Sequence, residues 1–138
     1  MLKKYQQTLA SSISFQGIGL HSGLKTKIKI KPGIEDQGIV FKRTDLKKNN
    51  LVVANYQNVS SARLCTTLKN KYGVKVSTVE HLLAALYICE IDNAEIEVNA
   101  EEIPIMDGSA LDFIRELENV NIKILNKKRK YLKINKKI

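Results

Sequence analysis

The stretch LKTKIKIK, residues 24–31, decides the class of fold because its side chains alternate strictly between two kinds. Leu24, Thr26, Ile28 and Ile30 fall on one side of the chain, and four lysines fall on the other. This period of two is typical of a β-strand that is buried on one face only. One face is therefore expected to pack on a core and the other to face solvent.

Several further segments have strand-like patterns bounded by turn residues. We expect strands at residues 12–15, 38–43, 51–54 and 94–99, and short closing strands at 121–125 and 131–135. Residues 63–68 and 74–77 flank the sequence KNKYG, which predicts a hairpin. These segments indicate a mostly antiparallel sheet.

Two helices interrupt the strands. Residues 77–80, STVE, have the spacing of a capping box, so a helix is expected to begin at about Thr78 and to be buried, since the following run is apolar on nearly every side. A second, amphipathic helix follows Asp107-Gly-Ser109, with Ser109 as its N-cap. Its expected buried face consists of Leu111, Phe113, Ile114 and Leu117. We predict one α+β domain, residues 1–138, with both helices on one face of the sheet.

Composition limits the classes of protein that remain possible. The 138 residues are 43% hydrophobic and 27% charged, which excludes an intrinsically disordered chain. No apolar run is long enough for a membrane span, the N-terminus does not resemble a signal peptide, and Cys65 and Cys89 lack metal-binding spacing. A cytoplasmic protein with reduced thiols is expected. The net charge of +9 arises mainly in residues 121–138, which hold eight of the 23 lysines and arginines and no acid.

Only two histidines, His21 and His81, are available for metal chemistry. Glu80 and His81 are neighbours on the expected helix, so their side chains diverge by about 100°. A division of roles fits this geometry, with His81 on a metal ion and Glu80 facing a bound water as general base. Structural roles remain open for each residue: Glu80 as part of the capping box, His81 as a buried hydrogen-bonding residue, and His21 as a turn residue. Cys65 could equally be a small buried residue, and Asp107 could simply shape its turn.

Four segments together resemble one enzyme family, the UDP-3-O-acyl-N-acetylglucosamine deacetylases. The segments are Gly17-Ile-Gly-Leu-His-Ser-Gly23, Leu64-Cys-Thr-Thr-Leu68, Ser77-Thr-Val-Glu-His-Leu-Leu-Ala-Ala-Leu86, and Ile91-Asp-Asn93 leading to Glu102-Ile-Pro-Ile-Met-Asp-Gly-Ser-Ala110. The resemblance implies a zinc enzyme of lipid A biosynthesis in Gram-negative bacteria. It also implies a reaction in which a zinc-bound water removes the N-acetyl group of UDP-3-O-(3-hydroxyacyl)-N-acetylglucosamine.

The resemblance also assigns roles to individual residues. It matches Glu80 to the general base, His81 to the first zinc ligand, Leu64 and Cys65 to the rim of the substrate site, and His21 to a loop near that site. The family fold is two similar α+β domains, of which this chain resembles the first, with residues 63–77 as a small hairpin insert and residues 121–138 as a basic closing segment.

The family's second domain supplies a zinc-ligating His, a zinc-ligating Asp and a catalytic His, and no match to it is present in this sequence. We therefore expect an incomplete zinc site, negligible deacetylase activity of this chain alone, and self-association through the exposed interdomain face. No nucleic-acid partner is expected. The rival interpretations are a basic nucleic-acid-binding module and a non-catalytic module that binds a nucleotide sugar.

Overall fold

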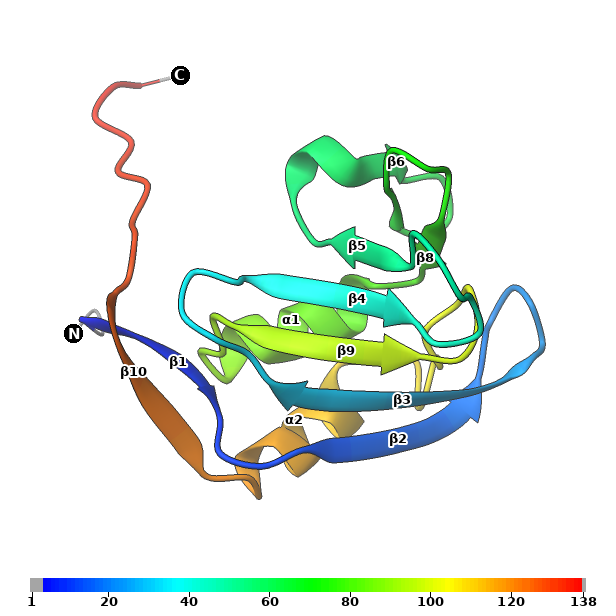
Figure 1. Cartoon of the computed structure of the whole chain (residues 1–138), viewed down its shortest axis with the longest axis horizontal. Coiled ribbons are helices and arrows are strands. Elements are labelled where there is room, and N and C mark those ends of the chain that lie inside the picture. Colours follow the sequence, from blue (N-terminus) through cyan, green and yellow to red (C-terminus); the bar gives the residue numbers. More distant parts are fainter. Residues whose placement is uncertain (1–3, 138) are drawn as a thin grey trace.

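The computed structural model describes residues 4–137, which form ten strands, two α-helices and one 3-10 helix. In chain order the elements are β1 (Tyr5–Leu9), β2 (Ile13–Ile18), β3 (Lys25–Pro32), β4 (Ile39–Arg43), β5 (Leu51–Val53), η1 (Tyr56–Asn58), β6 (Val59–Ser61), β7 (Thr67–Lys69), β8 (Lys75–Ser77), α1 (Glu80–Ile88), β9 (Ala94–Val98), α2 (Leu111–Glu118) and β10 (Ile122–Lys128). The predicted α+β class, with a mostly antiparallel sheet, is confirmed (Figure 1).

The main sheet has five strands in the order β2-β3-β9-β4-β5. All neighbouring strands are antiparallel except β4 and β9, which run parallel. The alternation predicted for residues 24–31 is confirmed within β3, where Thr26, Ile28 and Ile30 are buried while Lys27 and Lys29 are exposed. It is wrong for Leu24, which precedes the strand and is 58% exposed. Strand β3 therefore has one core face and one solvent face, as predicted.

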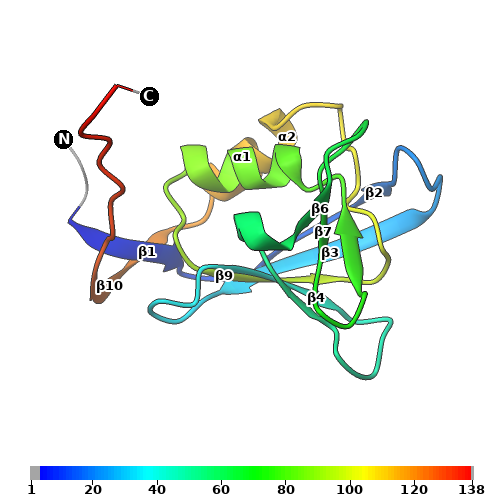
Figure 2. The ribbon, with the colours of Figure 1, turned by 90° about the horizontal axis from the view of Figure 1, so that it is seen from above.

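Both helices cover the same face of this sheet (Figure 2). The core lies between the two layers, and its fully buried side chains come from both. The sheet contributes Ile28, Ile30, Phe41, Ile96 and Val98, and the helices contribute Leu82, Leu86, Phe113 and Leu117. An edge-to-face aromatic pair joins the layers, since the ring centroids of Phe15 on β2 and Phe113 on α2 are 5.0 Å apart.

The opposite face of the sheet is polar. The ammonium of Lys31 on β3 lies 2.7 Å from a carboxylate oxygen of Glu97 and 2.9 Å from one of Glu95, both on β9. The hydrogen bond between Lys31 and Glu97 raises the pKa of the lysine and lowers the pKa of the carboxyl group. This cross-strand pairing is typical of a sheet face that is turned to water.

A small second sheet stands beside the main one, with the strand order β6-β7-β8. Strands β7 and β8 form the predicted hairpin, in which Leu68 lies opposite Val76. Strand β6, which the sequence did not indicate, adds to the free edge of β7. The chain leaves this sheet at Ser77 and enters α1 three residues later, so the small sheet and the start of α1 are neighbours.

The two ends of the described chain lie together as an antiparallel pair, β1 and β10. Strand β1 was not predicted, and the strand expected at residues 131–135 was wrong, because this segment has no regular secondary structure. The guanidinium of Arg129 fixes the chain just after β10, with Nη2 2.6 Å from the Asp92 carboxylate and 3.0 Å from the Glu90 carbonyl oxygen. Among residues 4–137, no helix has the length and apolar character needed to span a membrane.

We expect the substitution Phe113→Ala to lower the free energy of unfolding by about 3–5 kcal/mol, because it leaves a cavity between the two layers and removes the contact with Phe15. Leu111, which was expected on the buried face of this helix, is 44% exposed instead, so Leu111→Ala is the matched control. Its cost should be below about 1 kcal/mol. Chemical denaturation measures both. Equal losses for the two variants would show that α2 does not pack as described.

Candidate functional site

Helix α1 begins with the two residues that the sequence singled out, Glu80 and His81. The predicted capping box is wrong: the N-cap is Val79, and it makes no side-chain cap hydrogen bond. The hydroxyl of Ser77 accepts a hydrogen bond from Thr67 Oγ1 at 3.1 Å. Glu80 reaches sideways rather than back along its own helix, and its Oε2 accepts the backbone N–H of Thr66 at 3.0 Å. The capping explanation for Glu80 is thereby removed.

The contact with Thr66 also places the residues just before it. Leu64 has a positive φ of 69° and is 85% exposed, whereas Cys65 is half-buried with its Sγ 3.8 Å from Thr67 Oγ1. A leucine rarely adopts this backbone conformation, and such strain often occurs at functional loops. The Leu64–Cys65 loop therefore lies next to the Glu80 carboxylate.

His81 is half-buried, and its ring has an unsatisfied polar atom. The Nδ1 atom is buried and has no hydrogen-bond partner among residues 4–137. Buried ring nitrogens normally have a partner, and metal coordination is one way to supply it. No group of three or more His, Cys, Asp or Glu side chains in the described part of the chain could hold a metal ion. His81 therefore fits as one ligand, but the described residues do not form a three-ligand site.

The central acid of the site is one that the sequence analysis did not single out. Glu102 is 3% exposed, and its carboxylate accepts three hydrogen bonds. The donors are the backbone N–H of His21 at 3.0 Å, the backbone N–H of Ser22 at 2.8 Å, and Thr78 Oγ1 at 2.8 Å. Burial alone would raise the pKa of Glu102, but these three hydrogen bonds and the Ser22 side chain outweigh it and lower the pKa to about 2.

The glycine turn at residues 17–23 is shaped around this carboxylate. The turn closes on itself through the hydrogen bond from Gly23 N to Gly19 O at 2.9 Å. A Cβ atom on Gly19 would overlap Ser22 Oγ and Glu102 Oε2, so only glycine fits there. Gly17 is restricted in the same way, because its Cβ would lie 2.9 Å from Pro104 Cβ. The two glycines thus make room for residues 102–104, which pack against the turn.

Residues 101–105 join the turn to the start of α1 through the backbone as well. Ser77 N donates to Glu101 O at 2.8 Å, and Ile103 N donates to Ser77 O at 3.0 Å. Two residues later, Ile105 N donates to Ile18 O at 2.9 Å. This segment is thus hydrogen-bonded to β8 on one side and to the end of β2 on the other. It holds His21 and Glu80 in one region, although no hydrogen bond joins those two residues directly in the described chain.

The sequence-predicted site residues are therefore joined in two groups. Leu64, Cys65 and Glu80 are joined through the Thr66 contact. His21, whose side chain is exposed, is joined through Glu102 to Thr78, two residues before Glu80. Asp107 has the structural role left open for it, since its carboxylate accepts hydrogen bonds from Ser109 N and Oγ, both at 2.9 Å. Ser109 Oγ in turn accepts the Leu111 N–H, but the predicted N-cap is wrong by one residue, because the N-cap of α2 is Ala110.

The chain was compared with known proteins. Residues 6–138 match the family model for UDP-3-O-acyl N-acetylglycosamine deacetylase. The chain is 46% identical over 134 residues to the UDP-3-O-acyl-N-acetylglucosamine deacetylase of Geotalea uraniireducens, covering 97% of this chain and 43% of that protein. It is 46% identical over 133 residues to the protein of the same name from Colwellia psychrerythraea, covering 96% of this chain and 44% of the relative. The chain thus spans less than half the length of these relatives.

We expect Glu102→Gln to lower the free energy of unfolding by about 2–3 kcal/mol at neutral pH, because an amide cannot accept all three hydrogen bonds and leaves a buried donor unsatisfied. The folded-state pKa of Glu102 is depressed, so its contribution is present above pH 4.5 and is lost as pH falls toward 2. The difference between the two proteins should shrink over that interval. Denaturation at several pH values measures it, with the exposed Glu116→Gln as control. A constant difference across this range would contradict the assignment.

Proposed function

Because the chain belongs to the UDP-3-O-acyl-N-acetylglucosamine deacetylase family, we propose that it is the N-terminal half of a zinc-dependent deacetylase of lipid A biosynthesis. The proposed reaction hydrolyses the N-acetyl group of UDP-3-O-(3-hydroxyacyl)-N-acetylglucosamine. Water adds to the amide carbonyl carbon, the C–N bond breaks, and the products are acetate and a free amine. The two cysteines, Cys65 and Cys89, are free thiols, which is compatible with the reducing cytoplasm as the site of this reaction.

The orientation of the Glu80 carboxylate carries this proposal. A capping glutamate would turn back toward its own helix, but Glu80 faces the Leu64–Cys65 loop instead. Its Oε2 is fixed by the Thr66 N–H, and its Oε1 has no hydrogen bond among residues 4–137. A carboxylate held by one oxygen and free at the other can accept a proton from a water molecule. The proton is then available for the departing amine.

His81 is the residue of this chain that would hold zinc. When bound, zinc supplies Lewis-acid chemistry that makes a coordinated water easier to deprotonate. The unpaired, buried Nδ1 of His81 supports a metal-binding role for this ring. Glu80 and His81 are consecutive residues of α1, so their side chains point in different directions and the Glu80 carboxylate need not bind the metal itself. A catalytic zinc normally has three protein ligands. We propose that the other ligands come from the part of the relatives' length that this chain does not span.

Three residues are proposed to contact the substrate. Leu64 presents an apolar, exposed side chain beside the base, which suits an acyl chain, and Cys65 lies behind it. The exposed imidazole of His21 stands on the turn that Glu102 anchors. A polar side chain on a rigid turn can donate a hydrogen bond to a substrate.

The part of the relatives that this chain does not span is also the proposed partner of exposed apolar side chains on the helices. Tyr87 and Ile88 on α1 are 85% and 59% exposed, and Leu111 on α2 is 44% exposed. Exposed apolar side chains on a helical layer suit a protein interface. We propose that the second domain covers them, and that the isolated chain associates with itself through the same face, which sedimentation at rising concentration would reveal.

No nucleic-acid partner is proposed for the basic closing segment. Lys127 and Lys130 lie 3.3 Å and 3.6 Å from the carboxylate of Asp36, and Arg129 pairs with Asp92. These contacts occupy three of the segment's eight cations, which a polyanion would have to compete for. The segment is better explained by its pairing with β1 and its contacts with acids of this chain.

A chimera of this chain with the C-terminal part of the Geotalea uraniireducens relative tests the proposal. We expect it to bind zinc and release acetate from the UDP-sugar, while this chain alone does neither measurably. Glu80→Gln should lower kcat by about 100-fold or more with zinc content unchanged, because only the base is lost. His81→Ala should lower zinc content as well. The control is Glu116→Gln, which changes an exposed residue of α2. A Glu80→Gln chimera of full activity would refute the role of Glu80 as the base.

A further inference from the structure

Five lysines surround the junction between the β4–β5 loop and the β7–β8 turn. We call this group the lysine corner: Lys47, Lys48, Lys69, Lys71 and Lys75. All five are exposed, and none has an ion pair with an acid in the described part of the chain. The one acid between residues 44 and 75, Asp45, is occupied by the Arg43 guanidinium at 2.6 Å. This corner is therefore a positive surface without internal neutralisation.

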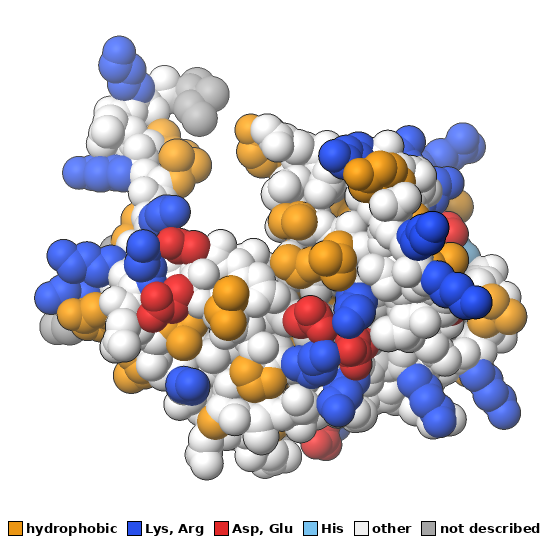
Figure 3. Space-filling model, viewed as in Figure 1, with side chains coloured by type: hydrophobic (Ala, Val, Ile, Leu, Met, Phe, Trp, Pro, Cys, Tyr) orange, Lys and Arg blue, Asp and Glu red, His pale blue; other side chains and the backbone are white. Residues whose placement is uncertain are grey.

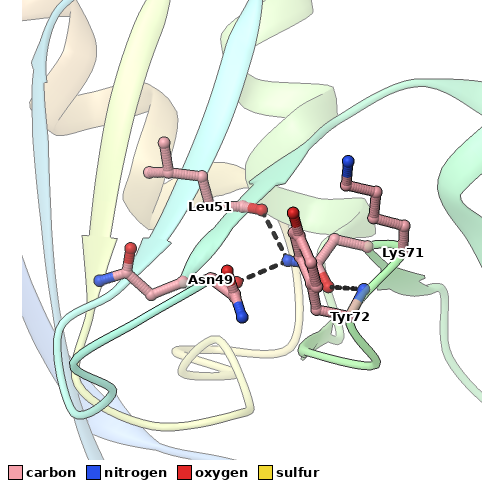
Figure 4. Close-up of a pocket in the computed structure, with 6 residues that line it drawn as sticks. Asn49, Leu51, Lys71 and Tyr72 are labelled. Atoms are coloured by element: carbon pink, nitrogen blue, oxygen red, sulfur yellow. Dashed lines mark hydrogen bonds between the residues drawn. The ribbon is translucent and has the colours of Figure 1, made fainter.

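One asparagine makes the corner rigid. Asn70 Nδ2 donates to Asn49 O at 2.7 Å and to Leu51 O at 2.9 Å, which ties the loop to the turn (Figure 4). Asn70 Oδ1 accepts the N–H groups of Tyr72 at 2.9 Å and Val74 at 3.0 Å, which holds the turn itself. The lysines on these two segments are thus held together by the fold.

The arrangement of charge in the hairpin is unfavourable without a partner. Lys69 and Lys75 lie directly opposite each other in the β7–β8 register. Like charges in that position destabilise a strand pair. On the open face of the main sheet, by contrast, Lys31 is balanced by Glu95 and Glu97. An external anion would relieve the repulsion in the hairpin.

Exposed apolar groups lie among the lysines. Tyr72 is 58% exposed and Leu51 is 50% exposed, and both line a shallow pocket of about 300 Å³ together with Asn49 and Lys71. The Lys71 ammonium lies 5.0 Å from the centre of the Tyr72 ring. Lysine and arginine side chains lie beside hydrophobic ones over the β6–β8 region of the surface (Figure 3). Tyrosine and lysine side by side are typical of surfaces that meet the headgroup region of a bilayer.

We propose that the lysine corner docks this chain on an anionic phospholipid surface. The five ammonium groups face headgroup phosphates, while Leu51 and Tyr72 enter the interface, and the pocket between them admits a headgroup. A single aromatic ring, Tyr72, stands at the corner, whereas single-stranded nucleic acid is normally bound by successive aromatic platforms along a groove. The lipid surface is therefore the better fit.

The position of the corner is compatible with the proposed catalytic site but independent of it. Strand β7 separates the turn at Asn70 from Thr66, the residue that contacts Glu80. At about 3.3 Å per residue, Thr66 and Asn70, which flank this strand, are on the order of 13 Å apart. Docking at the turn leaves the Glu80 end of the small sheet uncovered. Membrane binding can therefore be measured without any deacetylase activity.

Vesicle co-sedimentation of the full chain tests the proposal. We expect binding to vesicles of phosphatidylglycerol and phosphatidylcholine, little binding to phosphatidylcholine alone, and weaker binding as ionic strength rises. Lys69→Glu with Lys71→Glu should weaken binding about tenfold or more, because each lysine near the surface contributes to attraction. Tyr72→Ser should weaken it to a smaller degree. Circular dichroism establishes that each variant remains folded.

Two matched variants change the same charge elsewhere. Lys27→Glu with Lys29→Glu alters the open face of β3, and Lys133→Glu with Lys136→Glu alters the segment after β10. Both should retain most of the binding. The proposal is overturned if anionic vesicles do not bind the chain, if neutral vesicles bind it equally, or if either control loses as much as the lysine-corner variant. Tighter binding to a single-stranded oligonucleotide, lost in the same variant, would overturn it in favour of a nucleic-acid surface.

Discussion

The buried carboxylate of Glu102 is the constraint on which the arrangement of the candidate site depends. Burial at this depth raises the pKa of a carboxyl group, but the backbone N–H groups of His21 and Ser22 and the hydroxyls of Ser22 and Thr78 stabilise the charge and lower the pKa of Glu102 to about 2. The donors come from the His21 turn and from Thr78 at the start of α1, which share no direct hydrogen bond in residues 4–137. The acid therefore joins two parts of the chain that carry separate functional residues.

The local backbone at the start of α1 depends on the same contact. Thr78 has a positive φ of 57°, a conformation that is uncommon for a β-branched residue. Its hydroxyl donates a hydrogen bond to Glu102. Two residues later the Glu80 carboxylate accepts the Thr66 N–H, and the next side chain, His81, is half-buried. A strained residue kept in place by a buried acid gives the proposed base and the proposed metal ligand fixed directions.

Patterns in the sequence predicted the elements whose burial alternates, and failed where tertiary contacts decide. The alternation of residues 24–31 predicted β3 because every second side chain enters the core. Strand β1 was missed because three of its four buried residues, Gln6, Gln7 and Thr8, are polar. Thr8 Oγ1, for example, donates to Asn93 O at 2.7 Å and accepts the Gly33 N–H at 2.8 Å. The strand expected at residues 131–135 has a strand-like composition but no strand partner in the described chain.

The candidate site shows the same limit. Its residues were found by resemblance rather than by spacing, since the STVE sequence at residues 77–80 fits a capping box that does not form. The burial of Glu102 could have been suspected, because this glutamate directly precedes the apolar residues Ile103-Pro-Ile105. Its three donors lie far from it in the sequence, in the His21 turn and at Thr78. No local pattern records such distant contacts.

The ionisation of Glu102 is the most direct test of this account. Carbon-13 NMR of its side-chain carboxyl group, followed from neutral to acidic pH together with the His21 and Ser22 amide signals, measures it without any substitution. The account predicts that the carboxyl remains ionised through pH 4.5 and titrates near 2, with the two amides shifting in step. A midpoint close to 4.5, with both amides unaffected, would show that the buried acid does not hold the turn.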